Sequence, residues 1–260
     1  MTAPAAVELL DPLPGGRRFD AERTVRLGDV DPDGLLRSDA VGRYLQDVAS
    51  DDAVDAGLDN ALGWVVRRTL IRVERPAVAG ETVRLTTYCT GSGRSWAERR
   101  TRIRSEAGAH IDAVSLWVQL DVSTGRPARL GAGFFDVYGA SAGGRQVSAR
   151  LSLPGIPPVT DGRSMPWRFR RSDLDQFGHV NNAAQLAVVE EHRIHVERTG
   201  DLEVEYLAPV ASGADLLVVT DGGLDVRTSW MLDTDGSVST VFRWRRAGQT
   251  QPSSSEIGRS

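Results

Sequence analysis

The chain has 260 residues, of which 40% are hydrophobic and 25% charged, and its formal net charge is −4. This composition is typical of a folded globular protein, and the negative charge argues against bulk nucleic-acid binding, which needs a strongly basic face. The single cysteine, Cys89, excludes an internal disulfide framework, and every apolar run is far shorter than the ~18 residues of a membrane span.

The N-terminus carries no recognisable targeting signal. Glu8 and Asp11 stand where a signal peptide would carry positive charge, so we interpret residues 1–17 as a flexible tail. A chain without a signal and without a disulfide framework is expected in the cytoplasm. At the other end, residues 248–260 are rich in Ser, Gln and Pro and are expected to be disordered.

The first half of the chain predicts one strand, one helix and then a run of strands. A short strand over 21–27 leads into the loop Asp29–Gly34, and a helix follows from Ser38, its predicted N-cap, to about Ala56. The apolar residues of this helix recur at three- and four-residue steps: Val41, Tyr44, Leu45, Val48 and Ala49. After this helix the apolar residues recur at every second position, which predicts antiparallel strands over 64–73, 82–89, 94–104 and 110–120.

The second half predicts the same plan after a linker. Residues 131–164 are rich in Gly, Ala, Ser and Pro and are expected to form this linker, with one short ordered piece over 134–138. A strand over 165–170 and a polar loop then lead into a helix from about Asn181 to Thr199. Four further strands are predicted over 202–207, 215–220, 224–232 and 238–245.

The segment from Arg170 to Glu191 contains most of the candidate chemistry. Two carboxylates precede a glycine hinge, and an imidazole and two amides follow it: Asp173, Asp175, Gly178, His179, Asn181 and Asn182. Either asparagine can cap the helix that begins here, because a short side-chain oxygen accepts the free N–H groups of a first turn. Those N–H groups also favour a developing negative charge. The segment therefore predicts an active site at a helix N-terminus.

A degenerate copy of this segment lies 144 positions earlier, with Asp29, Asp31 and Gly34 in register with Asp173, Asp175 and Gly178. The copy then diverges: Leu35, Arg37 and Ser38 replace His179, Asn181 and Asn182, and Gln46-Asp47 replaces Glu190-Glu191. A second echo relates Pro76-Ala77-Val78-Ala79-Gly80 to Pro209-Val210-Ala211-Ser212-Gly213. Repeats at such long spacings predict two similar domains, over residues 18–130 and 165–247, rather than a solenoid.

A helix laid across a curved antiparallel sheet, present twice, is an α+β pattern without βαβ units. This plan and the motif Asp173-Leu174-Asp175-x-x-Gly178-His179-Val180-Asn181-Asn182 resemble the hotdog-fold thioesterases. More closely, the chain resembles the fatty acyl-ACP thioesterases, in which one polypeptide contains two fused hotdog domains. The similarity covers roughly residues 20–246. It is supported by Arg94-Ser95-Trp96, Ser115-Leu116-Trp117-Val118 and Glu203-Val204-Glu205-Tyr206.

The resemblance implies hydrolysis of a fatty acyl thioester, most plausibly acyl-ACP, to free fatty acid and carrier thiol. We assign Asp175 as general base or nucleophile, His179 to proton transfer, and Asn181 to orienting water or substrate. Asn182, Gly178 and Phe177 are assigned to substrate binding. A second acid is expected from a helix, with Glu191 as first choice and Asp47 as the alternative. For Asp175 and His179 the competing interpretation is a structural role in the loop, and for each helical acid it is a solvated helix face.

Two departures from the plant-type enzymes reduce this catalytic set. Their motif resembles Asp-x-Asn-x-His, and Phe177 occupies the position of the asparagine here. The acid and cysteine that they carry after the Glu-Tyr strand are replaced around Pro209-Val210. A mechanism with one acid, as in simpler hotdog enzymes, is therefore expected.

Two alternatives remain open at this point: an acyl-CoA thioesterase of the same superfamily, and a non-catalytic acyl-binding protein. The cluster Arg168, Arg170 and Arg171 beside the loop is the candidate docking point for an acidic carrier protein. No cofactor, metal, nucleic acid or membrane span is implied. The sequence leaves open the length of the acyl chain and whether the double unit forms a homodimer.

Overall fold

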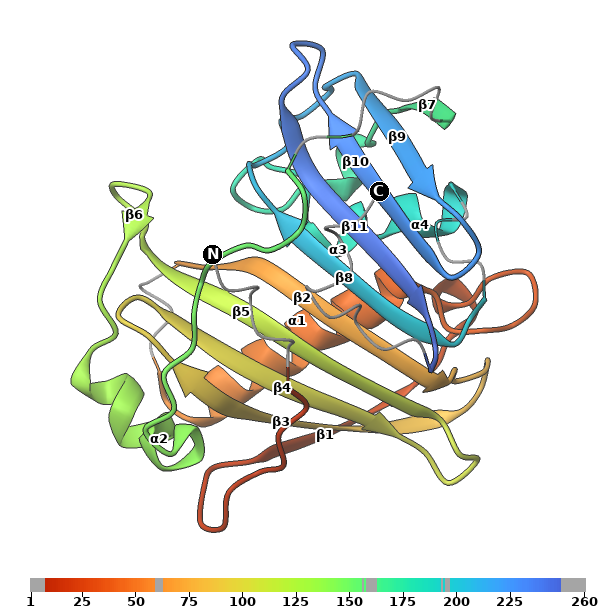
Figure 1. Cartoon of the computed structure of the whole chain (residues 1–260). Helices are drawn as coiled ribbons and strands as arrows, with labels where there is room; N and C mark the ends of the chain where they lie inside the picture. The colour runs from red at the N-terminus through yellow and green to blue at the C-terminus, as the bar shows by residue number, and fades with distance from the viewer. Residues whose placement is uncertain are drawn as a thin grey trace, which may run out of the picture.

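In the computed structural model, which describes residues 8–58, 63–155, 157, 163–192, 194 and 197–248, one antiparallel sheet runs through the whole molecule (Figure 1). Its strands follow the order β1-β3-β4-β5-β2-β8-β11-β10-β9-β7, with β6 paired to β5 at one corner. We call β1–β6 with α1 the N-terminal unit, and β7–β11 with α3 and α4 the C-terminal unit. The strands are β1 (Phe19–Thr24), β2 (Gly63–Arg75), β3 (Thr82–Ser92), β4 (Trp96–Arg104), β5 (His110–Asp121), β6 (Arg126–Pro127), β7 (Arg163–Trp167), β8 (Gly200–Tyr206), β9 (Leu216–Gly222), β10 (Val226–Leu232) and β11 (Val238–Arg246).

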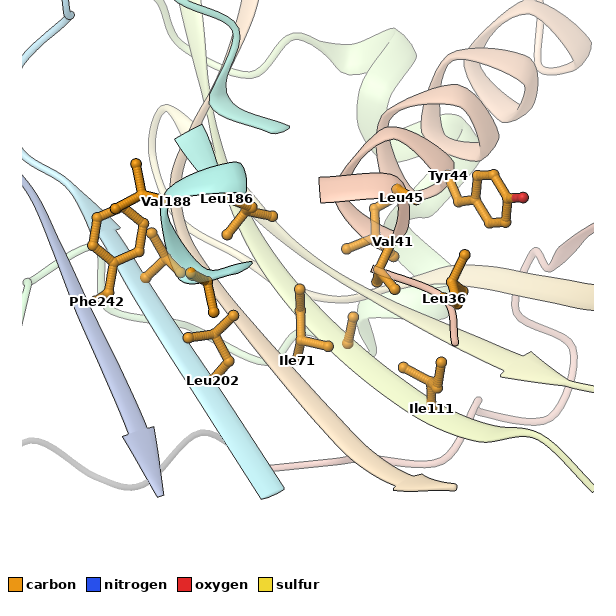
Figure 2. Close-up of a cluster of buried hydrophobic side chains, with 14 of the residues drawn as sticks. Leu36, Val41, Tyr44, Leu45, Ile71, Ile111, Leu186, Val188, Leu202 and Phe242 are labelled. Atoms are coloured by element: carbon orange, nitrogen blue, oxygen red, sulfur yellow. The ribbon is translucent and has the colours of Figure 1, made fainter. Parts of the chain in front are cut away.

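The two units share their sheet through one antiparallel strand pair. Residues 68–73 of β2 pair with residues 200–205 of β8, so each unit provides one central strand of the joined sheet. A single apolar core follows from this pairing, and Figure 2 shows that side chains of both units meet in it. Ile71 of β2 and Leu202 of β8 are paired in register, and both lie in that core. The predicted antiparallel strands are confirmed in both halves.

Helix α1 (Ser38–Asp55) packs its predicted stripe on the sheet of the N-terminal unit. Val41, Leu45 and Val48 are buried, as the spacing of the apolar residues predicts. The predicted N-cap is displaced by one residue, because Ser38 is the first helical residue and Arg37 is the N-cap. The Ser38 hydroxyl is not needed as a cap, since its amide N–H donates to a carboxylate from the other unit.

The second helix is shorter than the sequence predicts. In place of one helix over 181–199, the structure has α3 (Asn182–Gln185) and α4 (Ala187–Glu191), separated by a turn at Leu186. The Ile194 amide then donates to the Val189 carbonyl five residues back, which ends the helical pattern. Ile194 is fully buried in the core, and we attribute the early end of the helix to that burial.

The segment between the units is more ordered than a free linker. Its expected short piece is a helix of 11 residues, α2 (Ala132–Ala142), which buries Phe134 and Tyr138 against the N-terminal unit. The chain after α2 then crosses the face of the sheet opposite α1. It is held there by Trp96 Nε1, which donates to the Val147 carbonyl, and by the buried carboxylate of Glu205, which accepts from the amides of Ser152 and Leu153.

Part of the expected N-terminal tail also lies against the sheet. The Leu10 carbonyl accepts hydrogen bonds from the Tyr88 hydroxyl and from Arg100, and Arg17 pairs with Asp52 of α1. Residues 1–7 and 249–260 lie outside the described residues. Among the helices that the structure describes, none is long and apolar enough to cross a membrane.

Candidate active site

The loop before α3 is organised by its own carboxylates. Asp173 ends a 3-10 turn (Arg171–Asp173), and its Oδ2 accepts from the Arg170 amide at 2.7 Å. Asp175 Oδ1 accepts from the amides of Phe177 at 2.9 Å and His179 at 3.2 Å. Gly178 has a φ of +77°, a left-handed conformation that suits glycine. Short-range hydrogen bonds therefore fix much of the loop.

The copy in the N-terminal unit has the same frame. Asp31 Oδ1 accepts from the amides of Asp33 and Leu35, both at 2.9 Å, and Gly34 has a φ of +79°. The Asp29 carboxylate accepts from the amide three residues before it, as Asp173 does. The sequence repeat is therefore a repeat of backbone structure.

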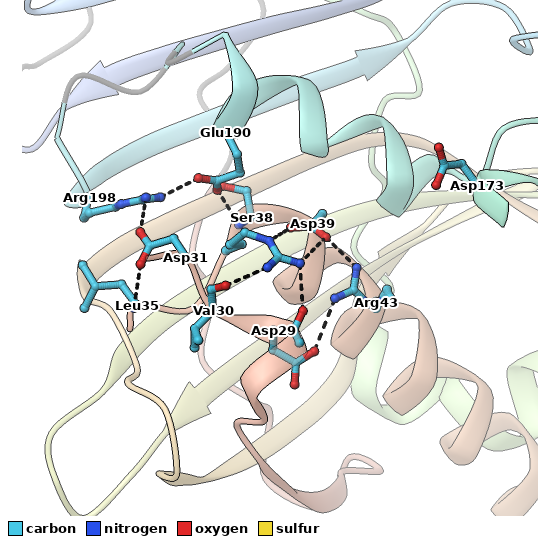
Figure 3. A network of polar contacts seen from close by, with 12 residues as sticks. Asp29, Val30, Asp31, Leu35, Ser38, Asp39, Arg43, Asp173, Glu190 and Arg198 are labelled. Atoms are coloured by element: carbon cyan, nitrogen blue, oxygen red, sulfur yellow. Dashed lines mark hydrogen bonds and ion pairs between the residues drawn. The ribbon is translucent and has the colours of Figure 1, made fainter. Parts of the chain in front are cut away.

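The two loops differ in what their polar groups contact. The second oxygen of Asp31 is ion-paired to Arg198 of the other unit, and Arg198 also pairs with Glu190 at 2.6 Å (Figure 3). In the C-terminal loop, within the part of the chain that the structure describes, neither Asp175 Oδ2 nor the His179 imidazole has a side-chain partner. His179 is exposed and Asp175 half-buried. Only the C-terminal loop therefore presents an acid and an imidazole to solvent.

The helices of the two units run antiparallel and cross closely. The crossing is at Gly42, where a Cβ atom would lie 2.7 Å from Leu186 Cδ1 and 3.0 Å from Ala183 Cβ. On one side of it, the Glu190 carboxylate accepts from the Ser38 amide at 2.8 Å. On the other side, Gln46 and Asn182 line one hollow. In the repeat, Ser38 corresponds to Asn182 and Gln46 corresponds to Glu190. The pair Ser38–Glu190 and the pair Gln46–Asn182 therefore occupy equivalent positions in the two units.

The hollow beside Asn182 lies between the two helices and the centre of the sheet. It is partly open to solvent, and its wall is mostly apolar. The Asn182 amide group donates to the Val66 carbonyl at 3.1 Å, and the Tyr206 hydroxyl donates to the Asn182 carbonyl at 3.1 Å. Burial raises the pKa of Tyr206, so this hydroxyl stays protonated and keeps its donor role. The lining residues are Gly42, Leu45, Gln46, Val66, Thr69, Ser115, Trp117, Asn182, Ala183, Leu186 and Tyr206.

The candidate residues separate into three groups. Asp175, Phe177, Gly178 and His179 lie on the loop, with the Phe177 side chain 53% exposed. Asn181 is the N-cap of α3 and accepts from the Ala183 amide at 2.7 Å, as a capping role predicts, whereas Asn182 faces the hollow.

The remaining candidates, the two helical acids and the three arginines, lie outside the loop and the hollow. Glu191 is exposed on α4 and does not line the hollow. Asp47 is also exposed, on α1. Two arginines of the predicted docking cluster have acidic neighbours. Arg170 pairs with Asp173 at 3.0 Å, and Arg168 lies 3.7 Å from Asp215. Arg171 is exposed beside them.

Sequence analysis missed the residues that cross between the units. Glu190, rather than Glu191, reaches the neighbouring helix, and Gln46 takes the related place opposite Asn182. The signal was present in the repeat, which aligns Gln46-Asp47 with Glu190-Glu191. The repeat does not show whether Gln46 or Asp47, and whether Glu190 or Glu191, faces the other unit. A helical acid thus reaches the N-terminal copy, whereas an amide faces the candidate active site.

The fold and this site define a double-hotdog protein of the thioesterase type. Residues 16–138 match the acyl-ACP thioesterase N-terminal domain, and residues 157–253 match the acyl-ACP thioesterase C-terminal domain. The chain therefore belongs to the acyl-ACP thioesterase family. The predicted α+β tandem hotdog fold is confirmed.

Two relatives align with most of the chain. The chain is 29% identical over 220 residues to an uncharacterized protein of Mycobacterium tuberculosis, covering 83% of this chain and 87% of that protein. It is 25% identical over 277 residues to the chloroplastic dodecanoyl-[acyl-carrier-protein] hydrolase of Umbellularia californica, covering 87% of this chain and 72% of that protein.

Solved structures share the double fold across most of the chain. The putative oleoyl thioesterase of Lactobacillus plantarum has a TM-score of 0.74 at 19% identity, covering 91% of this chain and 98% of its own. The 12:0-ACP thioesterase of Umbellularia californica has a TM-score of 0.70 at 23% identity, covering 88% and 96%. At these identities the likeness establishes the fold alone.

Proposed function

We propose that the protein hydrolyses fatty acyl thioesters, preferably carried by acyl carrier protein, and releases the free fatty acid and the carrier thiol. The observation that carries the proposal is the contrast between the two loops. They share one hydrogen-bonded frame, but Asp31 is ion-paired with Arg198, whereas in the described part of the C-terminal loop Asp175 Oδ2 and His179 have no side-chain partner, and Asn182, three residues after His179, lines the hollow. Family membership supplies the reaction class.

In the proposed reaction Asp175 acts as the general base. Two backbone amides hold Oδ1, so Oδ2 accepts a proton from water while the water oxygen attacks the thioester carbonyl carbon. The C–S bond then breaks, and the sulfur takes a proton from the His179 imidazolium and leaves as the thiol; the proton held by Asp175 returns to His179 through solvent. Asn182 binds the acyl group at the hollow, while Asn181 positions the backbone by capping α3.

The proposed set uses one acid because Asp173, the other carboxylate of the described loop, is bonded to Arg170. The position of the lost family asparagine holds the exposed Phe177, and Val210 is buried with its carbonyl accepting from the Val180 amide. The segment Pro209-Val210 therefore contacts the loop through a backbone hydrogen bond and brings no acid or thiol to it. Glu191 and Asp47 belong to exposed helix faces, and we leave them out of the mechanism.

The carrier preference is tested by ionic strength. Arg168, Arg170 and Arg171 form the proposed docking point for an acidic carrier protein, with Arg171 as the arginine that makes no ion pair among the described residues. Exposed charge pairs weaken as salt rises. Turnover of acyl-ACP should therefore fall with salt more steeply than turnover of acyl-CoA, and Arg171→Ala should reduce this difference.

The deciding experiment is a panel of acyl-ACP and acyl-CoA thioesters of increasing chain length, with the released thiol as readout. Hydrolysis with a higher kcat/KM on ACP supports the proposal. A higher kcat/KM on CoA would reassign the protein as an acyl-CoA thioesterase. An enzyme inert toward every thioester would overturn catalysis and leave an acyl-binding protein.

A further inference from the structure

Gln185 is a buried glutamine behind the candidate site, and the proposed mechanism does not use it. It is the last residue of α3, it is 1% exposed, and it follows Asn182 by three residues. Residues three positions apart are neighbours on one side of a helix. Burying an amide without hydrogen-bond partners is costly, so the contacts of this side chain call for a physical reason.

The two ends of the Gln185 carboxamide have partners of opposite kinds. Its oxygen Oε1 accepts from the buried Thr240 hydroxyl of β11 at 2.5 Å. Its nitrogen Nε2 donates to the Val180 carbonyl and to Asn182 Oδ1, both at 3.4 Å. A carbonyl oxygen can only accept, so the Val180 carbonyl determines which end of Gln185 is the donor.

The same reasoning fixes the orientation of the Asn182 side chain. Its nitrogen Nδ2 donates to the Val66 carbonyl of β2 at 3.1 Å, and its oxygen Oδ1 accepts from Gln185 Nε2. Reversing this amide would set its oxygen against the Val66 carbonyl and its N–H groups against those of Gln185. Both contacts would then be repulsive. Gln185 and Val66 together therefore hold Asn182 in one orientation.

These contacts leave one hydrogen of the Asn182 amide available. The nitrogen carries two hydrogens, and within the described residues it donates to the Val66 carbonyl alone. Asn182 is half-buried and lines the hollow, three residues after His179. The orientation that Gln185 holds therefore leaves an N–H donor beside the hollow.

We infer that Gln185 is a positioning residue, which holds Asn182 so that its free N–H binds the carbonyl oxygen of the thioester. The inference rests on the proposed hydrolysis and assigns a further residue to it. Negative charge develops on the carbonyl oxygen when water attacks the thioester carbon, and a donor that is already oriented stabilises this charge without reorganisation. Gln185 does not line the hollow, so it acts through Asn182.

The rate of thiol release tests whether Gln185 acts through Asn182. Asn182→Ala removes the donor and should lower kcat by about 10²-fold, the loss typical of one such donor. Gln185→Met nearly keeps the side-chain volume and removes the amide, so kcat should fall by about tenfold with little change in KM. The double variant should be no slower than Asn182→Ala, because the amide that Gln185 holds is then absent. A further loss in the double variant, or an unchanged kcat in Gln185→Met, would overturn the inference.

The chain contains a matched control for each change. Gln119→Met makes the same change at a second buried glutamine, which does not line the hollow, and should leave kcat unchanged. If Gln185→Met does not fold, Thr240→Val removes the hydroxyl that Gln185 accepts from and should lower kcat by about threefold. Thr228→Val is the control for this variant, because the Thr228 hydroxyl contacts Arg243 instead. Equal values of kcat in the two threonine variants, or in the two glutamine variants, would contradict the positioning role.

A spectroscopic test decides the inference without turnover. The probe is an acyl-pantetheine analogue with a methylene group between the carbonyl and the sulfur, which keeps the carbonyl oxygen and resists hydrolysis. It is added to the full chain with ¹⁵N-labelled side-chain amides, and the magnetic resonance signal of the Asn182 amide is identified by its loss in Asn182→Ala. This signal should shift in the wild-type protein and stay unchanged in Gln185→Met.

The two proposals fail in different ways in these measurements. An Asn182 signal that does not respond to the analogue, in a protein that hydrolyses thioesters, overturns the positioning role and leaves the proposed function intact. A response of the Asn182 signal that depends on Gln185, without hydrolysis of any thioester, overturns the proposed function and supports the orientation of Asn182 by Gln185.

Discussion

At the scale of single residues, we propose two tasks for one aspartate of the candidate site, one structural and one catalytic. Asp175 Oδ1 holds the loop through two amides, as Asp31 Oδ1 does in the copy. The difference lies in the second oxygen, which is ion-paired in Asp31 and, among the described residues, has no hydrogen-bond or ion-pair partner in Asp175. In the proposed mechanism, the loop structure and the reaction therefore use different oxygen atoms of the same carboxylate.

Asp175→Asn separates these two tasks. The asparagine oxygen can still accept from the amides of Phe177 and His179, but the group can no longer take a proton. We expect kcat to fall by roughly 10²–10⁴-fold with a small change in KM, measured by thiol release. Asp31→Asn is the matched control, since it makes the same change in a loop that lacks the imidazole. A larger loss of kcat in Asp31→Asn, with folding intact, would reverse the assignment of the two loops.

At the scale of elements, the closeness of the helices decides how the site is assembled. Gly42 of α1 has no side chain, and this lets α3 approach until Leu186 and Ala183 contact it. The crossing places Asn182 of α3 and Gln46 of α1 on one hollow. The site therefore depends on residues of both units, held by helix packing in the core.

Gly42→Val should damage this crossing. A Cβ at position 42 already meets Leu186 Cδ1 at 2.7 Å, and the two methyl groups of valine would force the helices apart. We expect the free energy of unfolding to fall by about 1–3 kcal/mol in urea denaturation, together with a lower kcat as Asn182 is displaced. Ser50→Val adds the same side chain on an exposed position of α1 and should change stability by only about 0.5 kcal/mol. Equal effects of the two variants would contradict the packing argument.

At the scale of the whole molecule, two features join the units in addition to the helix crossing and its polar contacts. The first is the pairing of β2 with β8, which makes one sheet and one core. The second is the segment after α2, which runs over the opposite face of the sheet and is fastened by Trp96, Glu205 and Trp230. Glu205 is 1% exposed, and its two oxygens accept from the amides of Ser152 and Leu153.

Glu205→Ala should loosen this segment. It leaves the amide of the buried Leu153, and that of Ser152, without an acceptor, so we expect a loss of roughly 1–3 kcal/mol in the free energy of unfolding. Trypsin should also cleave faster after Arg150, which lies within the released segment. Glu22→Ala is the control, because Glu22 is 64% exposed and only 3.6 Å from an exposed Arg84. Unchanged cleavage after Arg150 in Glu205→Ala would show that the segment is held by other contacts.

Much of the fold could be predicted because its signals are local. Alternating residues over 64–120 mark strands, and three- and four-residue spacing marks α1. The loop at Asp175 was also readable, since its hydrogen bonds join residues two to four positions apart. The end of the second helix was not, because it coincides with the burial of Ile194, which depends on the position of the sheet.

The sequence by itself thus determined the elements, their repetition and the chemical groups of the loop, because these depend on neighbours in the chain. Only the tertiary structure decided which groups face one another. The crossing at Gly42 sends Glu190 to the N-terminal copy and sets Gln46 opposite Asn182. The pairing of β2 with β5 likewise sets Trp117 beside Val66 in the hollow. Such contacts join residues far apart in the chain, and the packing of helices and strands, rather than local propensity, fixes them.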